Sequence, residues 1–121
     1  MFEIYQEFVF DAAHRFPQMP DGHRYAGLHG HSFRVGVTIA GEPAAGGFVV
    51  DLGELRHACD EVHGELDHAY LNDLPGLEVP SLENIARWVW ERLKPRYKGL
   101  AKVTVARDSL RQSCTYLGPE A

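Results

Sequence analysis

The stretch HRYAGLHGHSF, residues 23–33, contains three histidines in nine positions. His29 and His31 are two residues apart, so both imidazoles leave the same face of an extended strand. Gly30 lies between them and adds no side-chain bulk. Imidazole nitrogens are common zinc ligands, and two on one face can share a single ion. The pair therefore indicates a candidate metal site.

His14 is the third candidate ligand, because it has the parity of Phe8 and Phe10 in the alternating segment MFEIYQEFVFDAAH. If this strand neighbours the one that carries His29 and His31, three neutral imidazoles converge. Such a set leaves a fourth coordination position open, as in catalytic zinc sites. Two alternatives stay open: a histidine on an apolar face is often a hydrogen-bonded core residue, and iron, nickel and copper also bind imidazole.

The elements that must position these histidines follow from hydrophobic periodicity and turn residues. Strands are predicted at residues 1–14, 31–40, 47–51, 101–107 and 112–117. Two helices are predicted between the third and fourth strands. One begins after Asp51 and the other after Ser81, and each of these residues is a good N-cap.

Each predicted helix carries one apolar stripe. The first stripe comprises Leu52, Leu55, Cys59, Val62 and Leu66, and the second comprises Leu82, Ile85, Val89 and Leu93. This pattern predicts an α+β fold, with an antiparallel sheet and two helices on one face, in a single domain spanning residues 1–121. The second face and the edges of such a sheet stay open, which predicts a homo-oligomer closed edge to edge.

Composition narrows the function classes. The chain has 121 residues, a net charge of −5 and two cysteines. The negative charge argues against a nucleic-acid partner, and no apolar run is long enough to cross a membrane. The N-terminus has no early positive charge of the kind that secretory signals carry, and the low cysteine count is typical of a reducing compartment. We therefore expect a cytoplasmic protein.

A second constellation is ELDHAYLND, residues 65–73. Asp67 and His68 after the first helix are candidates for a carboxylate-oriented imidazole, a unit that works as a general acid or base near neutral pH. The alternative is a helix-terminating loop in which Asn72 and Asp73 make turn hydrogen bonds.

Asp108, between the last two predicted strands, is a third candidate. A carboxylate there can accept paired hydrogen bonds from an amidine-like edge such as that of a pterin or guanine. The alternative is a turn aspartate flanked by Arg107 and Arg111.

Several motifs occur together in one order along nearly the whole chain. They are FDAAHRFP, HGHSFRV, VVDLGELR, ELDHAYLND, PSLENIA and RDS…CTYLG. In this respect the chain resembles the 6-pyruvoyltetrahydropterin synthase family, most closely its bacterial 6-carboxy-5,6,7,8-tetrahydropterin synthase branch of the queuosine pathway. The resemblance implies the tunnelling fold, in which trimers close a β-barrel and two trimers form a homohexamer; a trimer alone stays an alternative. It also implies active sites between subunits.

The resemblance further implies roles for individual residues. Zinc falls on His14, His29 and His31, and the catalytic aspartate and histidine fall on Asp67 and His68. The pterin-anchoring glutamate of the family aligns with Asp108, a shorter acid. The implied substrate is 7,8-dihydroneopterin triphosphate, and the implied product is 6-carboxy-5,6,7,8-tetrahydropterin or 6-pyruvoyltetrahydropterin.

One position departs from the family pattern. Relatives usually carry a catalytic cysteine four residues before the first histidine of the HGH motif, where this chain has Tyr25. A phenol with a reference pKa of about 10 is a poorer base at pH 7 than a thiol of about 8.5. Either Tyr25 is activated, or His68 alone moves the proton, or the reaction has changed. Two further alternatives are therefore a retro-aldol cleavage to 6-hydroxymethyldihydropterin and a pterin-binding paralogue with little catalysis.

Overall fold

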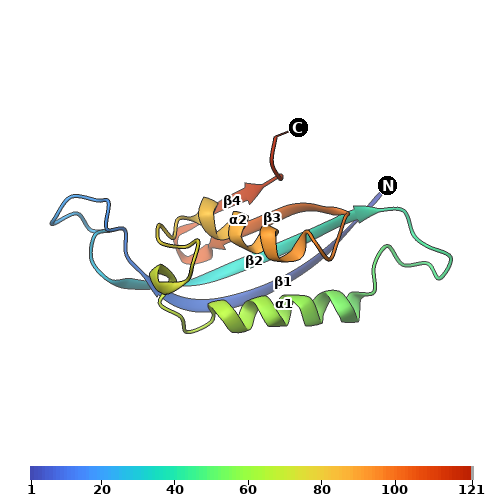
Figure 1. The fold of residues 1–121 in the computed structure, drawn as a ribbon, viewed down its shortest axis with the longest axis horizontal. Coiled ribbons are helices and arrows are strands. Elements are labelled where there is room, and N and C mark those ends of the chain that lie inside the picture. Colours follow the sequence, from blue (N-terminus) through green and yellow to red (C-terminus); the bar gives the residue numbers. More distant parts are fainter. Residues whose placement is uncertain (121) are drawn as a thin grey trace.

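The chain folds into one four-stranded antiparallel sheet with two α-helices (Figure 1). This computed structural model describes residues 1–120. The elements in chain order are β1 (Phe2–His14), β2 (His29–Gly41), α1 (Leu52–Leu66), the 3₁₀ turn η1 (Leu71–Asp73), α2 (Leu82–Leu93), β3 (Leu100–Arg107), the 3₁₀ turn η2 (Asp108–Leu110) and β4 (Gln112–Tyr116). The strands lie side by side in the order β1-β2-β3-β4, which confirms the predicted fold class.

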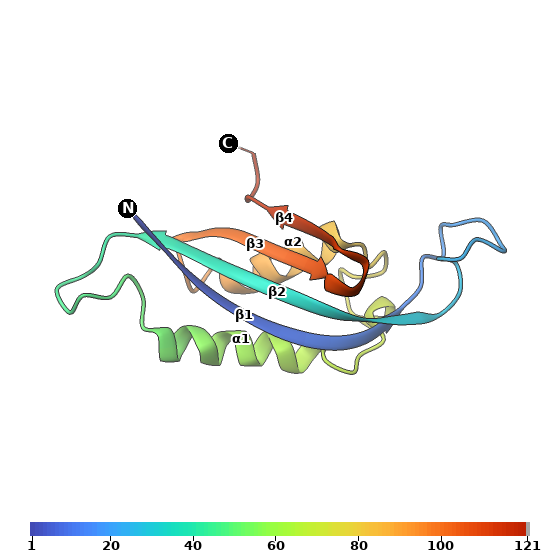
Figure 2. The same ribbon diagram turned by 180° about the vertical axis from the view of Figure 1, so that it is seen from behind.

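Both helices cover the same face of the sheet. Helix α1 lies along β1, and α2 lies against β3 and β4. The opposite view shows the strands in front, with no helix over them (Figure 2). The covered face holds the apolar positions predicted from alternation, since Phe10, Phe33, Val35 and Val37 are all at most 1% exposed. Burial of these alternating side chains fixes which face of each strand points inward.

Helix α1 begins where the sequence predicts. The side chain of Asp51 accepts hydrogen bonds from the backbone N–H groups of Gly53 and Glu54 at 2.8 and 3.1 Å, which satisfies donors that the first turn leaves free. The buried stripe then runs from Leu55 to Leu66. Leu52 was expected on that stripe but is 45% exposed, because it is the first residue of the helix and precedes the buried part of the stripe.

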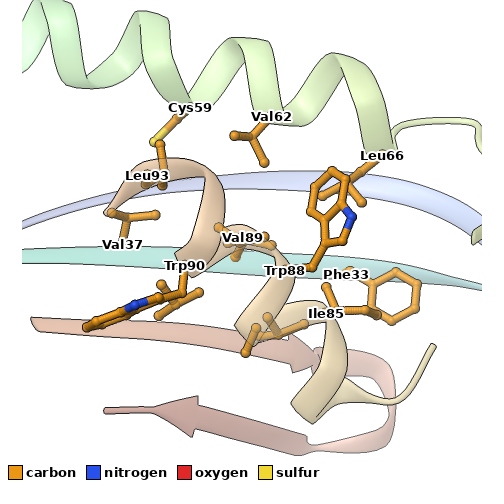
Figure 3. Packing of buried hydrophobic residues seen from close by; sticks show 14 of the residues in the cluster. Phe33, Val37, Cys59, Val62, Leu66, Ile85, Trp88, Val89, Trp90 and Leu93 are labelled. Carbon is orange, nitrogen blue, oxygen red and sulfur yellow. The ribbon is translucent and has the colours of Figure 1, made fainter. Parts of the chain in front are cut away.

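Helix α2 contributes six side chains to the core, and a close view of the packing shows several of them (Figure 3). Ser81 caps it by accepting a hydrogen bond from the N–H of Asn84 at 3.1 Å. Trp88 and Trp90 are 4% and 8% exposed, and the indole N–H of Trp88 donates to the Pro75 carbonyl at 3.1 Å. Both tryptophans are therefore packing residues of the core.

The predicted strand at 47–51 is wrong. Residues 44–48 instead form a tight turn, in which the N–H of Ala44 donates to Phe48 at 3.0 Å and that of Gly47 donates back to Ala44 at 2.8 Å. The end of β2 has no free side for another strand, because Ile39 pairs with Ile4 of β1 and with Leu100 of β3. Residues 49–51 after the turn thus lead directly into the N-terminal cap of α1.

The sheet edges are β1 and β4. Near its C-terminal end, the outer side of β1 is covered by the segment that follows α1. The N–H of Ala13 donates to Ala69 at 3.1 Å, and the N–H of His68 donates to Asp11 at 2.7 Å. This pairing brings the residues after α1 to the end of β1 that carries His14. In the described part of the chain, no helix combines the length and apolarity that a bilayer crossing requires.

Candidate metal centre and neighbouring groups

The three predicted histidines meet at one point between β1 and β2. Strand register places His14 directly opposite His29, and Ala12 opposite His31. The candidate ligand nitrogens of the three rings lie within 4.8 Å of one another. Their ring centroids are 4.5 to 5.0 Å apart, with steep interplanar angles of 65° to 87°. The rings therefore point toward a shared centre and do not stack.

Hydrogen bonds orient two of these rings. Nδ1 of His14 lies 3.3 Å from the Pro80 carbonyl oxygen, and Nδ1 of His29 lies 2.8 Å from that of Gly27. Because a carbonyl oxygen only accepts, each of these Nδ1 atoms carries the proton and each Nε2 keeps its lone pair. The Nε2 atoms of His14, His29 and His31 are all buried, and among residues 1–120 none has a hydrogen-bond partner. This tautomer and outer-shell pattern is typical of histidines that bind a metal.

The surroundings favour the neutral form of His14 and His31. Burial, and to a smaller extent the neighbouring imidazoles of His29 and His31, lower the pKa of His14 to about 4. Burial also lowers the pKa of His31. Neutral imidazole is the form that coordinates metal. Three buried acceptors without donors are costly in an apolar setting, so the site fits a cation such as zinc.

Asp67 and His68 form the predicted carboxylate–imidazole pair. Nδ1 of His68 lies 2.8 Å from Oδ2 of Asp67, whose Oδ1 accepts from the backbone N–H of Asp11 at 3.0 Å. These two hydrogen bonds, first that from Asp11 and then that from His68, lower the pKa of the Asp67 carboxyl. His68 has a φ of 59°, an uncommon conformation for a side-chain-bearing residue, and its side chain is 82% exposed. The carboxylate is anchored, and the imidazole faces outward.

One open cleft of about 590 Å³ is lined by residues of both groups of histidines. Its walls include His31 of the three-histidine centre and His68 of the pair, with Asp11, Ser32 and Tyr70 beside them. The hydroxyl of Ser32 donates to the Asp11 side chain. A substrate held in this cleft would contact His68 and, at His31, one member of the histidine centre.

Tyr25 lies next to the centre. Its ring is 6.1 Å from that of His29 and 6.2 Å from that of Phe16. The backbone carbonyl of Tyr25 accepts from the N–H of Phe16 at 2.9 Å, which fixes the loop against the end of β1. The two cysteines lie elsewhere: Cys59 is buried on α1 (Figure 3), where burial raises the pKa of its thiol to about 11, and Cys114 lies on β4.

Asp108 is held by an arginine. Nε and Nη2 of Arg34 donate to its two carboxylate oxygens at 3.0 and 3.1 Å. This fork lowers the pKa of Asp108. Arg34 also lies 3.6 Å from Glu7 and donates to the Tyr5 hydroxyl at 3.3 Å, and these residues belong to the face of the sheet that no helix covers. Asp108 is thus an ion-paired carboxylate beside the open face of the sheet. The three histidines, in contrast, point to the covered face.

Arg107 is a charged residue near the centre that the sequence-based analysis did not select. It follows Val103 and Val105 at a spacing of two, and both valines are fully buried. Its Nε is buried, and within residues 1–120 that atom has no hydrogen-bond partner. Its positive charge contributes to the lowered pKa of both His14 and His31. The sequence alone could have indicated Arg107 as a candidate, because an arginine at an apolar position of an alternating strand is unusual.

Comparisons with known proteins agree with this fold and site. The family model described as 6-pyruvoyl tetrahydropterin synthase matches residues 3–119. A 6-carboxy-5,6,7,8-tetrahydropterin synthase of Synechocystis is 38% identical over 98% of this chain and 95% of its own length. A dihydroneopterin monophosphate aldolase of Pyrococcus furiosus is 37% identical over 78% of this chain and 76% of its own. The chain therefore belongs to the 6-pyruvoyl tetrahydropterin synthase family.

A solved structure supports the same conclusion at the level of the fold. The 6-pyruvoyl tetrahydropterin synthase of Caenorhabditis elegans superposes with a TM-score of 0.86, covering 98% of this chain and 96% of its own, at 27% sequence identity. The family resemblance inferred from the motifs is confirmed.

Proposed function

We propose that this chain is a zinc-dependent pterin enzyme that converts 7,8-dihydroneopterin triphosphate to 6-carboxy-5,6,7,8-tetrahydropterin, for queuosine-type 7-deazapurine biosynthesis, or to 6-pyruvoyltetrahydropterin. The observation that carries the proposal is the set of three buried, unpartnered Nε2 atoms within residues 1–120. Support for the pterin comes from the family membership and from the 38% identical relative named as a 6-carboxytetrahydropterin synthase.

In this proposal His14, His29 and His31 would hold the zinc ion. When bound, the ion would act as a Lewis acid on oxygens of the substrate's side chain. His68 exchanges a proton with the substrate from the wall of the cleft. Asp67 accepts a hydrogen bond from Nδ1 of His68, which leaves the lone pair of Nε2 available as the base.

Tyr25 takes the place of the family cysteine. Its ring lies beside His29, so its phenol can enter the same site. An unactivated phenol is a weak base at pH 7, which transfers more of the proton chemistry to His68. A Tyr25→Cys variant restores the usual residue, and its rate relative to that of the native chain measures what the substitution costs.

The retro-aldol reaction is the second candidate function. The 37% identical relative from Pyrococcus furiosus is named as an aldolase for dihydroneopterin monophosphate. Cleavage of the side chain would leave 6-hydroxymethyldihydropterin for a folate route. The third candidate, a pterin-binding paralogue with little catalysis, keeps the zinc and the pterin and loses turnover.

Other features of the family extend the proposal. Asp108 would anchor the pterin edge, with Arg34 holding its carboxylate in place. Self-association into a homohexamer or trimer would pair the sheet edges of neighbouring subunits, β4 and the uncovered part of β1, and would build active sites between them. The reaction would take place in the cytoplasm.

The experiment is product analysis by mass spectrometry. Zinc-loaded protein is incubated with 7,8-dihydroneopterin triphosphate, and the masses of carboxy, pyruvoyl and hydroxymethyl products separate the three reactions. His29→Ala should abolish both turnover and zinc binding. His57→Ala, which removes an exposed histidine of α1, is the matched control and should change neither. Unchanged turnover in His29→Ala would contradict the proposal, and pterin binding without any product would favour the paralogue.

A further inference from the structure

Arg107 is placed to face the histidine centre. In the β2–β3 register Arg34 pairs with Ala106 and Val35 pairs with Val105. Val35 and Val105 point to the covered face, so Arg107, two residues after Val105, leaves that same face. His14 and His31 also point to this side, because they share the parity of the buried Phe10 and Phe33.

The hydrogen bonding of Arg107 is incomplete. Its Nη2 donates to the side-chain oxygen of Gln112 at 3.3 Å, whereas its buried Nε has no partner in the described residues. Arg34, Arg92 and Arg96 each have a carboxylate within 3.0 to 3.1 Å. Over residues 1–120 no carboxylate stands in such contact with Arg107. A guanidinium with a buried free donor is poised for an anion.

The position of this charge also argues for an anion. A fixed positive charge beside a site suited to a divalent cation repels that cation, and the repulsion is strong where water is excluded. A negatively charged group that contacts the guanidinium offsets the repulsion. Because Gln112 holds one side of the fork, the buried Nε and the remaining N–H groups stay available for an oxyanion.

We propose that Arg107 is a substrate-binding residue that contacts a phosphate of the pterin substrate's side chain beside the three-histidine centre. The inference rests on the proposed function, since it concerns the same site. By this inference, Arg107 makes the protein bind a phosphorylated dihydropterin more tightly than an unphosphorylated one. A guanidinium also binds carboxylates, so the test below compares two ligands that differ only in their phosphates.

The test compares the affinities of two ligands within each variant. Dissociation constants of 7,8-dihydroneopterin and of its triphosphate are measured by pterin fluorescence on the zinc-loaded protein, and their ratio is taken. A ratio cancels any change that affects both ligands alike, including a change in zinc content. We expect the native chain to bind the triphosphate more tightly. Arg107→Gln should reduce this preference by about tenfold to a hundredfold, as for the loss of a charge-assisted hydrogen bond.

Two further variants make the test specific. Arg111→Gln removes an equal charge from an exposed side chain in the same turn and should keep the native ratio. Arg107→Lys keeps the charge without the planar fork, so it should show a smaller loss of preference, and it also serves if Arg107→Gln does not fold. An unchanged ratio in the Arg107 variants, with pterin binding intact, would overturn this inference alone. A ratio near one in the native chain would also overturn the inference about Arg107. If neither pterin binds to the native chain, both this inference and the proposed function are overturned.

Discussion

Replacing Asp67 by asparagine isolates the proton-transfer role of the Asp67–His68 pair. Oδ1 of Asp67 accepts from the Asp11 N–H at 3.0 Å, while Oδ2 faces Nδ1 of His68 at 2.8 Å. In Asp67→Asn the amide oxygen has to stay toward Asp11, because an NH₂ group there would face another donor. The NH₂ group then faces His68, so Nδ1 must become the acceptor and the proton moves to Nε2.

The consequence is a histidine in the wrong tautomer. Nε2 of His68 no longer has a free lone pair, and the variant loses the general base that contributes about 10²- to 10⁴-fold to a rate. We expect kcat for 7,8-dihydroneopterin triphosphate to fall by that factor, with a smaller change in KM because the cleft walls are unaltered. Folding should be preserved, since the hydrogen bond from Asp11 remains.

Two measurements check this reasoning. Steady-state kinetics gives the loss in kcat, with Asp73→Asn as a matched acid-to-amide control outside the pair. Nitrogen NMR of the His68 ring gives the tautomer without reference to activity, and should show protonated Nδ1 in the native chain and protonated Nε2 in the variant. A variant that turns over within about threefold of the native rate, or that keeps its proton on Nδ1, would refute the argument.

Three further outcomes follow from the packing and charges. Leu66→Ala should lower the free energy of unfolding in urea by about 3 kcal/mol, because this side chain is fully buried, whereas Leu52→Ala, at 45% exposure, should change it by less than about 0.5 kcal/mol; equal losses would contradict the structure. Asn72→Ala should cost about 2–3 kcal/mol in the same assay, because its amide makes three hydrogen bonds to the backbone of residues 15 and 78; an unchanged midpoint would count against this clamp. The pKa of Asp108 is lowered in the fold by Arg34, so its contribution to stability is present above the pKa of the unfolded carboxyl and is lost as pH falls through the folded value. Asp108→Asn should therefore show a shallower loss of stability from pH 5 to pH 3 than the native chain, and parallel curves would contradict it.

Period-two alternation was enough to place the histidines on one face. His14 shares the parity of the buried Phe10, and His31 shares that of Phe33, so both point to the covered side. Alternation does not set the register between two strands that a 14-residue loop connects. The pairing of His14 with His29 brings the three rings together, and that pairing depends on contacts along the whole length of β1 and β2.

Other features depended on contacts that a local pattern does not contain. The segment 47–51 has the composition of a strand, but both sides of β2 are already paired at that end. The ion pair of Arg34 with Asp108 joins residues 74 positions apart, so the sequence offered only a turn aspartate or a pterin anchor. Arg107 could have been selected from its place in the alternation of β3, because Val103 and Val105, the two preceding residues of the same parity, are buried.

The central claim is that His14, His29 and His31 bind one metal ion. Elemental analysis of the purified native chain, supplied with zinc and then dialysed, tests it most directly when His14→Ala, His29→Ala and His31→Ala are measured beside it. We expect one zinc per native chain, and a loss of at least about tenfold in zinc affinity for each variant. A native chain that retains no zinc, or a His31→Ala chain that keeps the full amount, would contradict the claim.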